Sequence, residues 1–482
     1  MNPLDRLPIS TPRRRRLQLR SIALLCAALL LTLPAPGIAA DAPIKLNPPM
    51  ITGGNANSPT ISPDGRTVIY RADQETDEIV ELYSVPIGGG STPVKLNPPL
   101  GASGDVSFGI SVTADSSAVI FRASGQPGGG QQLFSVPTEG GTPVRLDGPL
   151  APGGTVFFFR LSPDGTRVLY DADQDTDGVR ELYSVPVGGG SATRLSGPMT
   201  AGGNVTSPGM TSPDGSTVVY RADQESDNVF ELYSVPIDGG TVTKLNPPLP
   251  EGADVGDEDF EISPDGSTVV FVTTQDTSGR QALYSVPIHG GTATRLTPPL
   301  VDGGNIDTSI FGFITADGST VVYVADQDVD DQFEIYSVPI EGGSVTRLSS
   351  TLQPGQNVSS VYEISADGSR VVYQTFDANG PSELFSVATG DGPVTRLNAP
   401  LPATDEVAYY VLSHDGSFVV YATVARSVVD KVLNVSNASP KGFNSPPNAL
   451  FSVPIAGGTA VPLATGFAEG SGIDEFAISL DD

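Results

Sequence analysis

The sequence predicts an all-β protein built from repeated four-stranded antiparallel units. One sequence block recurs every 48 to 52 residues along almost the whole chain. The 55 Gly and 43 Pro indicate many turns, and no long helical periodicity follows the first 40 residues. Short apolar runs such as "TVVY" alternate with Asp-Gly and Gly-Gly dipeptides, which favour hairpin turns because they tolerate a positive φ.

Each unit starts from a turn of the form "ISPDGRTVIY", which returns as "LSPDGTRVLY", "TSPDGSTVVY" and five further variants. A second block, "ELYSVPIGGG", follows each turn, and a third, such as "VTKLNPPL", closes the unit. The aspartates that anchor the eight copies are Asp64, Asp115, Asp164, Asp214, Asp265, Asp317, Asp367 and Asp415. The period therefore defines eight units.

Each unit reads as four strands, A to D. Strand A ends in "IS", strand B is "TVVY", strand C is "ELYSVP" and strand D is "TKL". Four strands per repeat of this length are typical of a β-propeller blade, so we expect eight blades, with seven as the alternative. "IKLNPPM" (44–50) looks like an extra strand D and "FAISLDD" (476–482) like an extra strand A, and either could close the ring.

The "SPDG" turn, the apolar strand after it and "LYSVPIDGG" resemble the TolB-like propellers, which share the WD-repeat architecture. The resemblance covers essentially all of the chain after residue 40. It implies a fold, and it leaves the function open because propellers carry many functions.

Residues 1–40 are predicted to be a cleaved signal peptide, and residues 41–482 a single propeller domain. "RRRRLQLR" is a basic region, "SIALLCAALLLTL" an apolar core and "APGIAA" a small-residue cleavage region. The apolar core is too short for a comfortable membrane span, so we expect export to the periplasm or the extracellular space without a stable membrane anchor. The only cysteine, Cys26, lies in this leader, which leaves residues 41–482 without disulfides.

The charge of the chain is strongly negative. Residues 41–482 hold 20 of the 26 basic residues and 54 of the 55 acidic ones. Such a chain repels phosphate backbones, so a nucleic acid partner is excluded, whereas cation binding is compatible. We expect a monomer.

The loops between strands B and C carry the candidate metal ligands. In the third unit, "DQDTDGVRE" places Asp173, Asp175, Asp177 and Glu181 at positions 1, 3, 5 and 9, with the backbone carbonyl of Val179 between them. Alternating carboxylates in a tight loop can supply the six to eight oxygen ligands that calcium needs. The spacing resembles the start of an EF-hand loop and, more closely, the calcium-binding hairpins of integrin-type propellers.

Three further loops keep four acids at the same positions. They are Asp73, Glu75, Asp77 and Glu81 in the first unit; Asp223, Glu225, Asp227 and Glu231 in the fourth; and Asp326, Asp328, Asp330 and Glu334 in the sixth. Calcium is therefore the hypothesis for these loops. The alternative is that they are solvated acidic hairpins, in which clustered like charges weaken the fold.

The sequence favours a non-catalytic scaffold that binds a protein or a glycan. Its two histidines, His289 and His414, lie in predicted turns, and no "GxSxG" motif is present. A carbohydrate-active hydrolase or lyase that uses rim or channel carboxylates is the alternative, because acids are plentiful. An insertion at residues 424–447 brings basic residues to this acidic chain and is a speculative partner-binding element: Arg426, Lys431 and Lys441.

Overall fold

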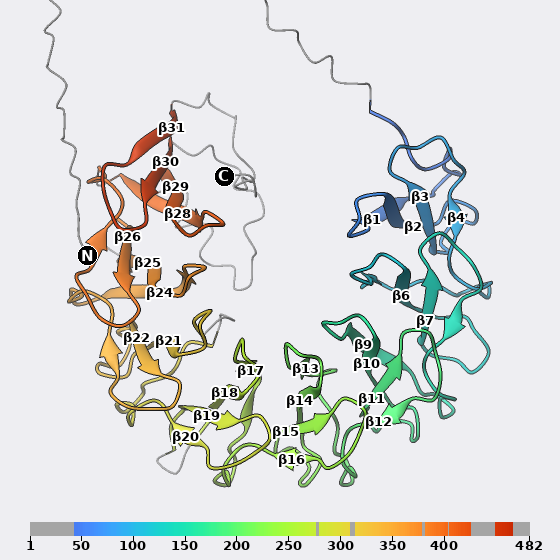
Figure 1. Cartoon of the computed structure of the whole chain (residues 1–482), viewed down its shortest axis with the longest axis horizontal. Coiled ribbons are helices and arrows are strands. Elements are labelled where there is room, and N and C mark those ends of the chain that lie inside the picture. The colour runs from blue at the N-terminus through green and yellow to red at the C-terminus, as the bar shows by residue number, and fades with distance from the viewer. Residues whose placement is uncertain are drawn as a thin grey trace, which may run out of the picture. The chain divides into compact units, whose positions relative to one another are not determined.

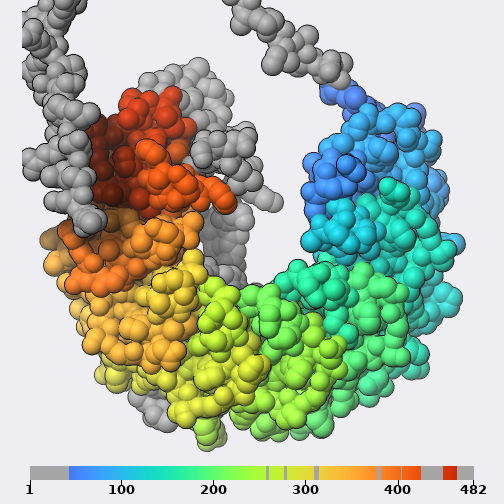
Figure 2. Space-filling model, in the orientation of Figure 1, coloured from blue at the N-terminus to red at the C-terminus, as the bar shows by residue number. Residues whose placement is uncertain are grey.

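The computed structural model describes residues 43–275, 279–308, 314–377, 381–402, 404–425 and 449–465. All described strands lie in the compact unit Lys45–Asp482. They form eight separate antiparallel sheets, each made from one contiguous stretch of chain (Figure 1). Successive sheets pack side by side in chain order (Figure 2). The described residues contain no helix long and apolar enough to cross a membrane.

Within each sheet the strands are ordered as they occur in the sequence, A-B-C-D. The A strands are β1 (Ala56–Ile61), β5 (Ser111–Val112), β9 (Val156–Leu161), β13 (Met210–Thr211), β17 (Val255–Ile262), β24 (Gln356–Ile364) and β28 (Asp405–Leu412). The B strands are β2 (Thr67–Ala72), β6 (Ala118–Ala123), β10 (Arg167–Ala172), β14 (Thr217–Ala222), β18 (Thr268–Thr273), β21 (Thr320–Ala325), β25 (Arg370–Asp377) and β29 (Phe418–Ala425).

The C and D strands complete the blades. The C strands are β3 (Glu81–Pro86), β7 (Gln132–Pro137), β11 (Glu181–Pro186), β15 (Glu231–Pro236), β19 (Ala282–Pro287), β22 (Glu334–Pro339), β26 (Glu383–Ala388) and β30 (Ala449–Pro454). The D strands are β4 (Val94–Lys95), β8 (Val144–Arg145), β12 (Thr193–Arg194), β16 (Thr243–Lys244), β20 (Thr294–Arg295), β23 (Thr346–Arg347), β27 (Thr395–Arg396) and β31 (Val461–Thr465).

The A–B turn is fixed by its aspartate and its glycine. In the third blade, Asp164 Oδ1 accepts hydrogen bonds from Ser162 Oγ at 2.5 Å and from Thr166 N at 3.1 Å. Gly165 follows at φ 69°, a conformation that glycine adopts without steric cost. The turn therefore folds locally, and it sets the register of strands A and B.

The core of each blade contains one stacked aromatic pair between strands B and C. Tyr170 faces Tyr183 with ring centroids 5.2 Å apart, and the equivalent pairs of all eight blades lie at 5.2 to 5.6 Å. Offset stacking of this kind adds about 0.5–1.5 kcal/mol to the burial of the rings. The repeated "Y…LYS" of the sequence thus encodes the packing of strand B on strand C.

Neighbouring blades are joined by an apolar cluster and by hydrogen bonds. Ile69, Leu82 and Leu96 of the first blade pack with Val119 and Phe121 of the second. From the same blade, Arg71 Nη2 donates to the carbonyl oxygen of Val106 at 2.7 Å. Arg221 Nε makes the equivalent bond to Val255 O at 2.8 Å. The carbonyl groups of Val106, in an isolated bridge before β5, and of Val255, at the start of β17, are thereby satisfied from the preceding blade.

The predicted all-β fold with eight blades is confirmed, and the seven-blade alternative is not; among the described residues, seven of the sheets have four strands. The sixth sheet has three strands, β21 to β23, and an isolated bridge from Ile314 to Val321 stands where its strand A would lie. Residues 44–50, predicted as an extra strand D, form no strand. Outside the described residues lie the predicted signal peptide, the insertion from Arg426 onward with Lys431 and Lys441, and the final segment 476–482.

Candidate functional site: the acidic loops

The first acid of each acidic loop is a buried structural residue. Asp73, Asp173, Asp223 and Asp326 are 1 to 7% exposed. In the fourth blade, Asp223 Oδ1 accepts a hydrogen bond from Asn204 N at 2.6 Å, and Oδ2 accepts one from Asn228 N at 2.8 Å. In the other three loops the backbone N–H groups of two residues donate to this aspartate in the same way: Asn55 and Glu78 to Asp73, Thr155 and Gly178 to Asp173, and Asn305 and Asp331 to Asp326. This carboxylate therefore ties the B–C loop to the crossover that enters the same blade.

The sixth residue of the loop takes a left-handed backbone so that its N–H can reach this aspartate. Its φ is 63° in Glu78, 78° in Gly178, 60° in Asn228 and 61° in Asp331. Only glycine adopts this conformation freely, and asparagine and aspartate tolerate it better than most residues. The third loop is thus the least strained of the four at this position.

The third acid of the loop lies against a glycine of the crossover. A Cβ added to Gly53, Gly153, Gly202 or Gly303 would lie 3.0 Å or less from the carboxylate of Asp77, Asp177, Asp227 or Asp330 respectively. These glycines have φ between 87° and 97°. Each starts a Gly-Gly pair followed by Asn or Thr, and such a pair occurs in the crossovers of the four acidic blades and in no other crossover. This pairing of crossover and loop is a signal that the loop spacing alone does not reveal.

The ninth-position glutamates contact side chains of strands C and D. Glu181 Oε2 accepts a hydrogen bond from Tyr183 Oη at 2.8 Å, and Oε1 pairs with Arg194 Nη1 of strand D at 2.7 Å. Glu81, Glu231 and Glu334 make the same contacts with Tyr83 and Lys95, Tyr233 and Lys244, and Tyr336 and Arg347. Burial, together with the neighbouring Glu181, raises the pKa of Tyr183 far above its ordinary value, so the phenol stays a donor.

The acids at position 3 of the loops interact with the same strand C and strand D side chains as the ninth-position glutamates. Glu75 Oε2 lies 2.6 Å from Lys95 Nζ, and Glu225 Oε2 lies 3.2 Å from Lys244 Nζ. Asp328 Oδ2 accepts a hydrogen bond from Tyr336 Oη at 3.0 Å. The negative charge of Asp175 contributes to the raised pKa of Tyr183. The four acids of a loop therefore divide into positions 1 and 5 at the crossover and positions 3 and 9 at strand D.

The sixth loop gathers three carboxylates in a group compatible with a metal ion. One oxygen each of Asp326, Asp330 and Asp331 lies within 4.8 Å of the other two. This is the only such group of three among the residues that the structure describes. In the third loop the position of Asp331 is taken by Gly178, and Val179 donates its N–H to Thr176 O at 3.0 Å. The third loop therefore lacks the third carboxylate that Asp331 supplies in the sixth loop.

One buried carboxylate lies next to the third acidic loop. Asp171 of β10 is fully buried, and its Oδ2 accepts a hydrogen bond from Arg180 Nε at 2.9 Å. Burial raises the pKa of Asp171 to about 6, against the opposing effect of Arg180. The second blade has Arg122 at the equivalent position, where it donates to Val156 O at 3.1 Å. The third blade has Asp171 at this position of strand B, and its arginine, Arg180, comes from the B–C loop. Arg180 donates to the carbonyl oxygen of Thr206 at 3.4 Å.

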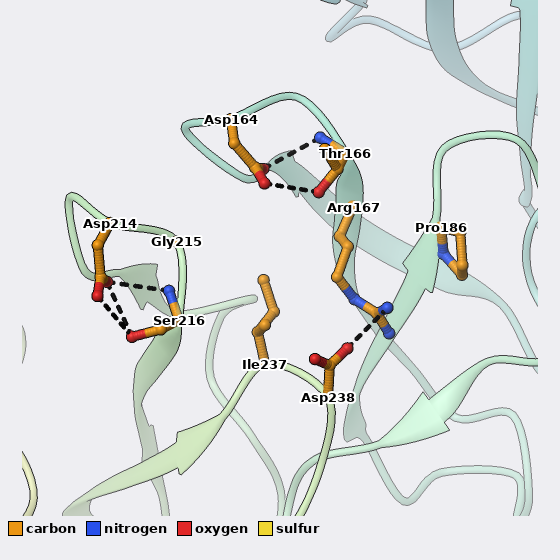
Figure 3. A pocket seen from close by; sticks show the side chains of 9 residues that line it. All are labelled: Asp164, Thr166, Arg167, Pro186, Asp214, Gly215, Ser216, Ile237 and Asp238. Carbon is orange, nitrogen blue, oxygen red and sulfur yellow. Dashed lines mark hydrogen bonds and ion pairs between the residues drawn. The ribbon is translucent and has the colours of Figure 1, made fainter.

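A groove opens between the third and fourth blades at the A–B and C–D turns (Figure 3). It has a volume of about 420 Å³ and is lined by Asp164, Thr166, Arg167, Pro186, Asp214, Gly215, Ser216, Ile237 and Asp238. Arg167 spans the groove, since its Nε donates to Ser184 Oγ at 2.7 Å and its Nη1 lies 2.9 Å from Asp238 Oδ1 of the next blade. The side chain of Ile237 lies between the two A–B turns.

Two of the groove aspartates, Asp164 and Asp214, are charged at neutral pH. A hydrogen bond from the Ser212 side chain and one from Ser216 N lower the pKa of Asp214 to about 2. The pKa of Asp164 is lowered for the same reasons, by Ser162 and Thr166. As predicted, His289 and His414 are exposed turn residues, and neither lines the groove. The described lining therefore offers charged side chains together with hydrogen-bond donors and acceptors.

A scan against protein-family models finds no match, and neither does a search of curated proteins. Among solved structures, a putative TolB from Agrobacterium tumefaciens is 20% identical, with a TM-score of 0.30, over 50% of this chain and 80% of that one. A prolyl endopeptidase is 15% identical, with a TM-score of 0.39, over 82% of this chain and 56% of its own. Prolyl oligopeptidase B from Galerina marginata is 13% identical, with a TM-score of 0.38, over 81% of this chain and 57% of its own.

The chain thus spans little more than half the length of the two prolyl peptidases. Because all three TM-scores are below 0.5, the fold is assigned from the sheets themselves. The protein is an eight-bladed β-propeller.

Proposed function

We propose that the protein is an exported, non-catalytic β-propeller that binds a protein or glycan partner, and that calcium stabilises its acidic loops. The groove between the third and fourth blades is the observation that carries the binding role. It combines three carboxylates, one guanidinium and the apolar side chains of Ile237 and Pro186. Such a mixture of charged and apolar groups is typical of recognition sites.

The chemistry of the groove favours binding over catalysis. Asp214 stays ionised because its pKa is about 2, so it cannot act as a general acid near neutral pH. Arg167 is held by Ser184 and Asp238, which fixes its guanidinium as a hydrogen-bond donor. A partner would meet a preformed surface, and preformed surfaces lose little conformational entropy on binding.

The calcium proposal rests on the sixth loop. Asp326, Asp330 and Asp331 present three carboxylate oxygens close together, and oxygen ligands of this kind are those that calcium takes. A bound cation would also reduce the mutual repulsion of these acids. The first and fourth loops share the same backbone with Glu78 or Asn228 in place of Asp331, so we expect weaker binding there.

The experiment is capture of partners from native envelope extract and from culture medium, with calcium and with chelator. We expect a saturable partner whose affinity falls when calcium is removed. In parallel, the purified protein is incubated with glycans and peptides. Turnover that disappears when a groove or rim carboxylate is replaced would identify an enzyme and overturn the proposal.

A further inference from the structure

The groove between the third and fourth blades carries more negative than positive charge. Its lining holds the carboxylates of Asp164, Asp214 and Asp238 and one guanidinium, that of Arg167. Arg167 Nη1 lies 2.9 Å from Asp238 Oδ1, so these two groups offset each other. Within the described lining, Asp164 and Asp214 are therefore left without a positively charged partner.

These two carboxylates belong to A–B turns that touch each other across the blade boundary. A Cβ added to Gly215, which follows Asp214, would lie 3.7 Å from Asp164 Cγ. Each turn fixes its own carboxylate. Ser162 Oγ donates to Asp164 Oδ1 at 2.5 Å, and in the next blade Ser212 Oγ donates to the Oδ1 of its own turn aspartate at 2.6 Å. Because both groups are already oriented, a ligand binds them with little loss of side-chain freedom.

Each of the two carboxylates has an oxygen with room for a further donor (Figure 3). In the described contacts, Asp164 Oδ2 accepts a hydrogen bond only from Thr166 Oγ1, at 2.7 Å. Asp214 Oδ2 accepts one only from Ser216 Oγ, at 2.9 Å. A carboxylate oxygen has two lone pairs and can accept two hydrogen bonds. Each of these Oδ2 atoms is therefore able to accept one more N–H donor from a ligand.

The size and lining of the groove fit an organic cation better than a metal ion. Its volume of about 420 Å³ lies within the range of about 300–1,000 Å³ that is usual for organic ligands. Among the residues that the structure describes, the only three carboxylates gathered closely enough for a metal ion lie in the sixth loop. Ile237 lies between the two A–B turns and adds apolar surface (Figure 3). A lysine or arginine side chain matches this lining, because it joins an aliphatic stem to a charged head.

The guanidinium of Arg167 narrows the class of ligand further. Its Nε donates to Ser184 Oγ at 2.7 Å and its Nη1 pairs with Asp238, whereas its Nη2 makes no hydrogen bond in the described contacts. The groove thus offers one donor beside its two acceptor carboxylates. A peptide satisfies both kinds of group, since its backbone carbonyl accepts from Arg167 while its basic side chain donates. A free amine lacks this acceptor, and a neutral glycan lacks the charge.

We propose that this groove binds a segment of a protein partner through a lysine or arginine side chain. The inference rests on the proposed function and narrows its ligand from a protein or glycan to a basic protein segment. The charged head donates to Asp164 Oδ2 and Asp214 Oδ2, and the backbone carbonyl of the segment accepts from Arg167 Nη2. Residues 41–482 hold 54 acidic and 20 basic residues, so the field of the whole chain attracts such a partner.

The junction between the seventh and eighth blades repeats much of this arrangement and supplies the control. Its turn aspartates, Asp367 and Asp415, have a pKa of about 2 because a Ser side chain and a backbone N–H donate to each of them. Arg370 is the counterpart of the groove arginine, but Ala456 stands where the fourth blade has Asp238. The positive charge of Arg370 is therefore not offset at that position, and none of these control residues lines the groove.

The test measures the binding of two fluorescent probe peptides to the full chain by anisotropy. One probe is a blocked alanine- and leucine-based pentapeptide with two lysines, and the other has glutamates in place of the lysines. Both are measured with the wild type, with Asp164→Asn/Asp214→Asn and with the control Asp367→Asn/Asp415→Asn. The two double variants remove the same charge from equivalent turns. Asparagine keeps the oxygen that accepts the hydrogen bonds of the turn, so both variants retain the fold.

We expect the lysine peptide to bind the wild type and to displace the captured partner, and the glutamate peptide to do neither. Asp164→Asn/Asp214→Asn should weaken binding of the lysine peptide about tenfold or more, and the control about twofold or less. Equal losses in both double variants would overturn the inference, because they would show a general attraction to the acidic surface. Binding of the glutamate peptide through the groove would overturn it as well.

The captured partner separates this inference from the proposed function. If Arg167→Ala weakens the partner but the lysine peptide does not displace it, the groove is a binding site and the basic ligand is wrong. If no partner is captured and the lysine peptide still binds through Asp164 and Asp214, the proposed partner role fails while the preference of the groove for a basic peptide is supported.

Discussion

At the scale of single residues, Asp171 is expected to give the protein a pH-dependent stability. Its pKa is raised to about 6, from an ordinary value of 3.8, so the folded state binds this proton more tightly than the unfolded state. The contribution is fully present below about pH 4 and is lost as pH rises through about 6, with an upper limit of about 3 kcal/mol.

Urea denaturation of the wild type and of Asp171→Asn at several pH values checks this. The asparagine does not titrate, so the wild type should lose stability relative to the variant between pH 4 and pH 7. A difference in unfolding free energy that stays constant over this range would show that Asp171 titrates at its ordinary pKa.

Asp331 is the residue that distinguishes the sixth acidic loop. We expect calcium to raise the melting temperature of the wild type, and we expect Asp331→Asn to reduce this rise because one of three carboxylates is removed. Asn is a mild replacement, since Asn228 holds the equivalent position at φ 60°.

The reverse change supplies the control. Asn228→Asp gives the fourth loop the same three acids as the sixth, and it should strengthen the calcium response measured by calorimetry. If calcium affects the wild type and both variants alike, the ion binds elsewhere or not specifically.

At the scale of elements, the acidic loop and its crossover act as one unit. Asp173 accepts two backbone N–H groups and is 4% exposed, whereas Asp175 accepts no backbone N–H in the described contacts. Asp173→Ala should therefore lower the unfolding free energy by about 1–3 kcal/mol, because it leaves buried donors unsatisfied. Asp175→Ala should change it by about 0.5 kcal/mol or less. Equal effects in urea denaturation would contradict this division of roles.

The crossover glycine gives a second prediction at this scale. Gly202 has φ 91° and lies against Asp227, so Gly202→Ala should destabilise the protein and speed proteolysis of the fourth loop. Gly188 has no neighbour within 4 Å and no positive φ, which makes Gly188→Ala the matched control. Limited proteolysis of both variants measures the difference, and similar cleavage rates would show that the crossover does not brace the loop.

The sequence predicts the strands of a blade well and the roles of its loop acids less well. "SPDG", "TVVY" and "LYSVP" each encode local geometry, so the fold follows from the repeat. In the structure Glu181 opens a strand, and its carboxylate contacts Tyr183 and Arg194. Loop spacing cannot reveal this, since the cation comes from strand D, 13 residues further along the chain.

At the scale of the whole molecule, the eight A–B turns should make the protein sensitive to acid. All eight anchor aspartates have lowered pKa values, mainly because a Ser or Thr side chain donates to them. For Asp115, Asp214, Asp367 and Asp415 the pKa falls to about 2. Their stabilising effect is present above about pH 4 and is lost as pH falls toward 2. A melting temperature that stays constant between pH 4 and pH 2 would contradict this.

The central claim is that the propeller binds a partner through the groove between its third and fourth blades. The most direct measurement compares the dissociation constant of the captured partner for the wild type, Arg167→Ala and Arg370→Ala. Arg370 makes the same bond to a strand C serine, Ser386, at 2.8 Å, but it does not line the groove. We predict that Arg167→Ala weakens binding about tenfold or more, which corresponds to about 1.4 kcal/mol, and that Arg370→Ala leaves it unchanged. Equal affinities for all three proteins, or equal losses in both variants, would contradict the claim.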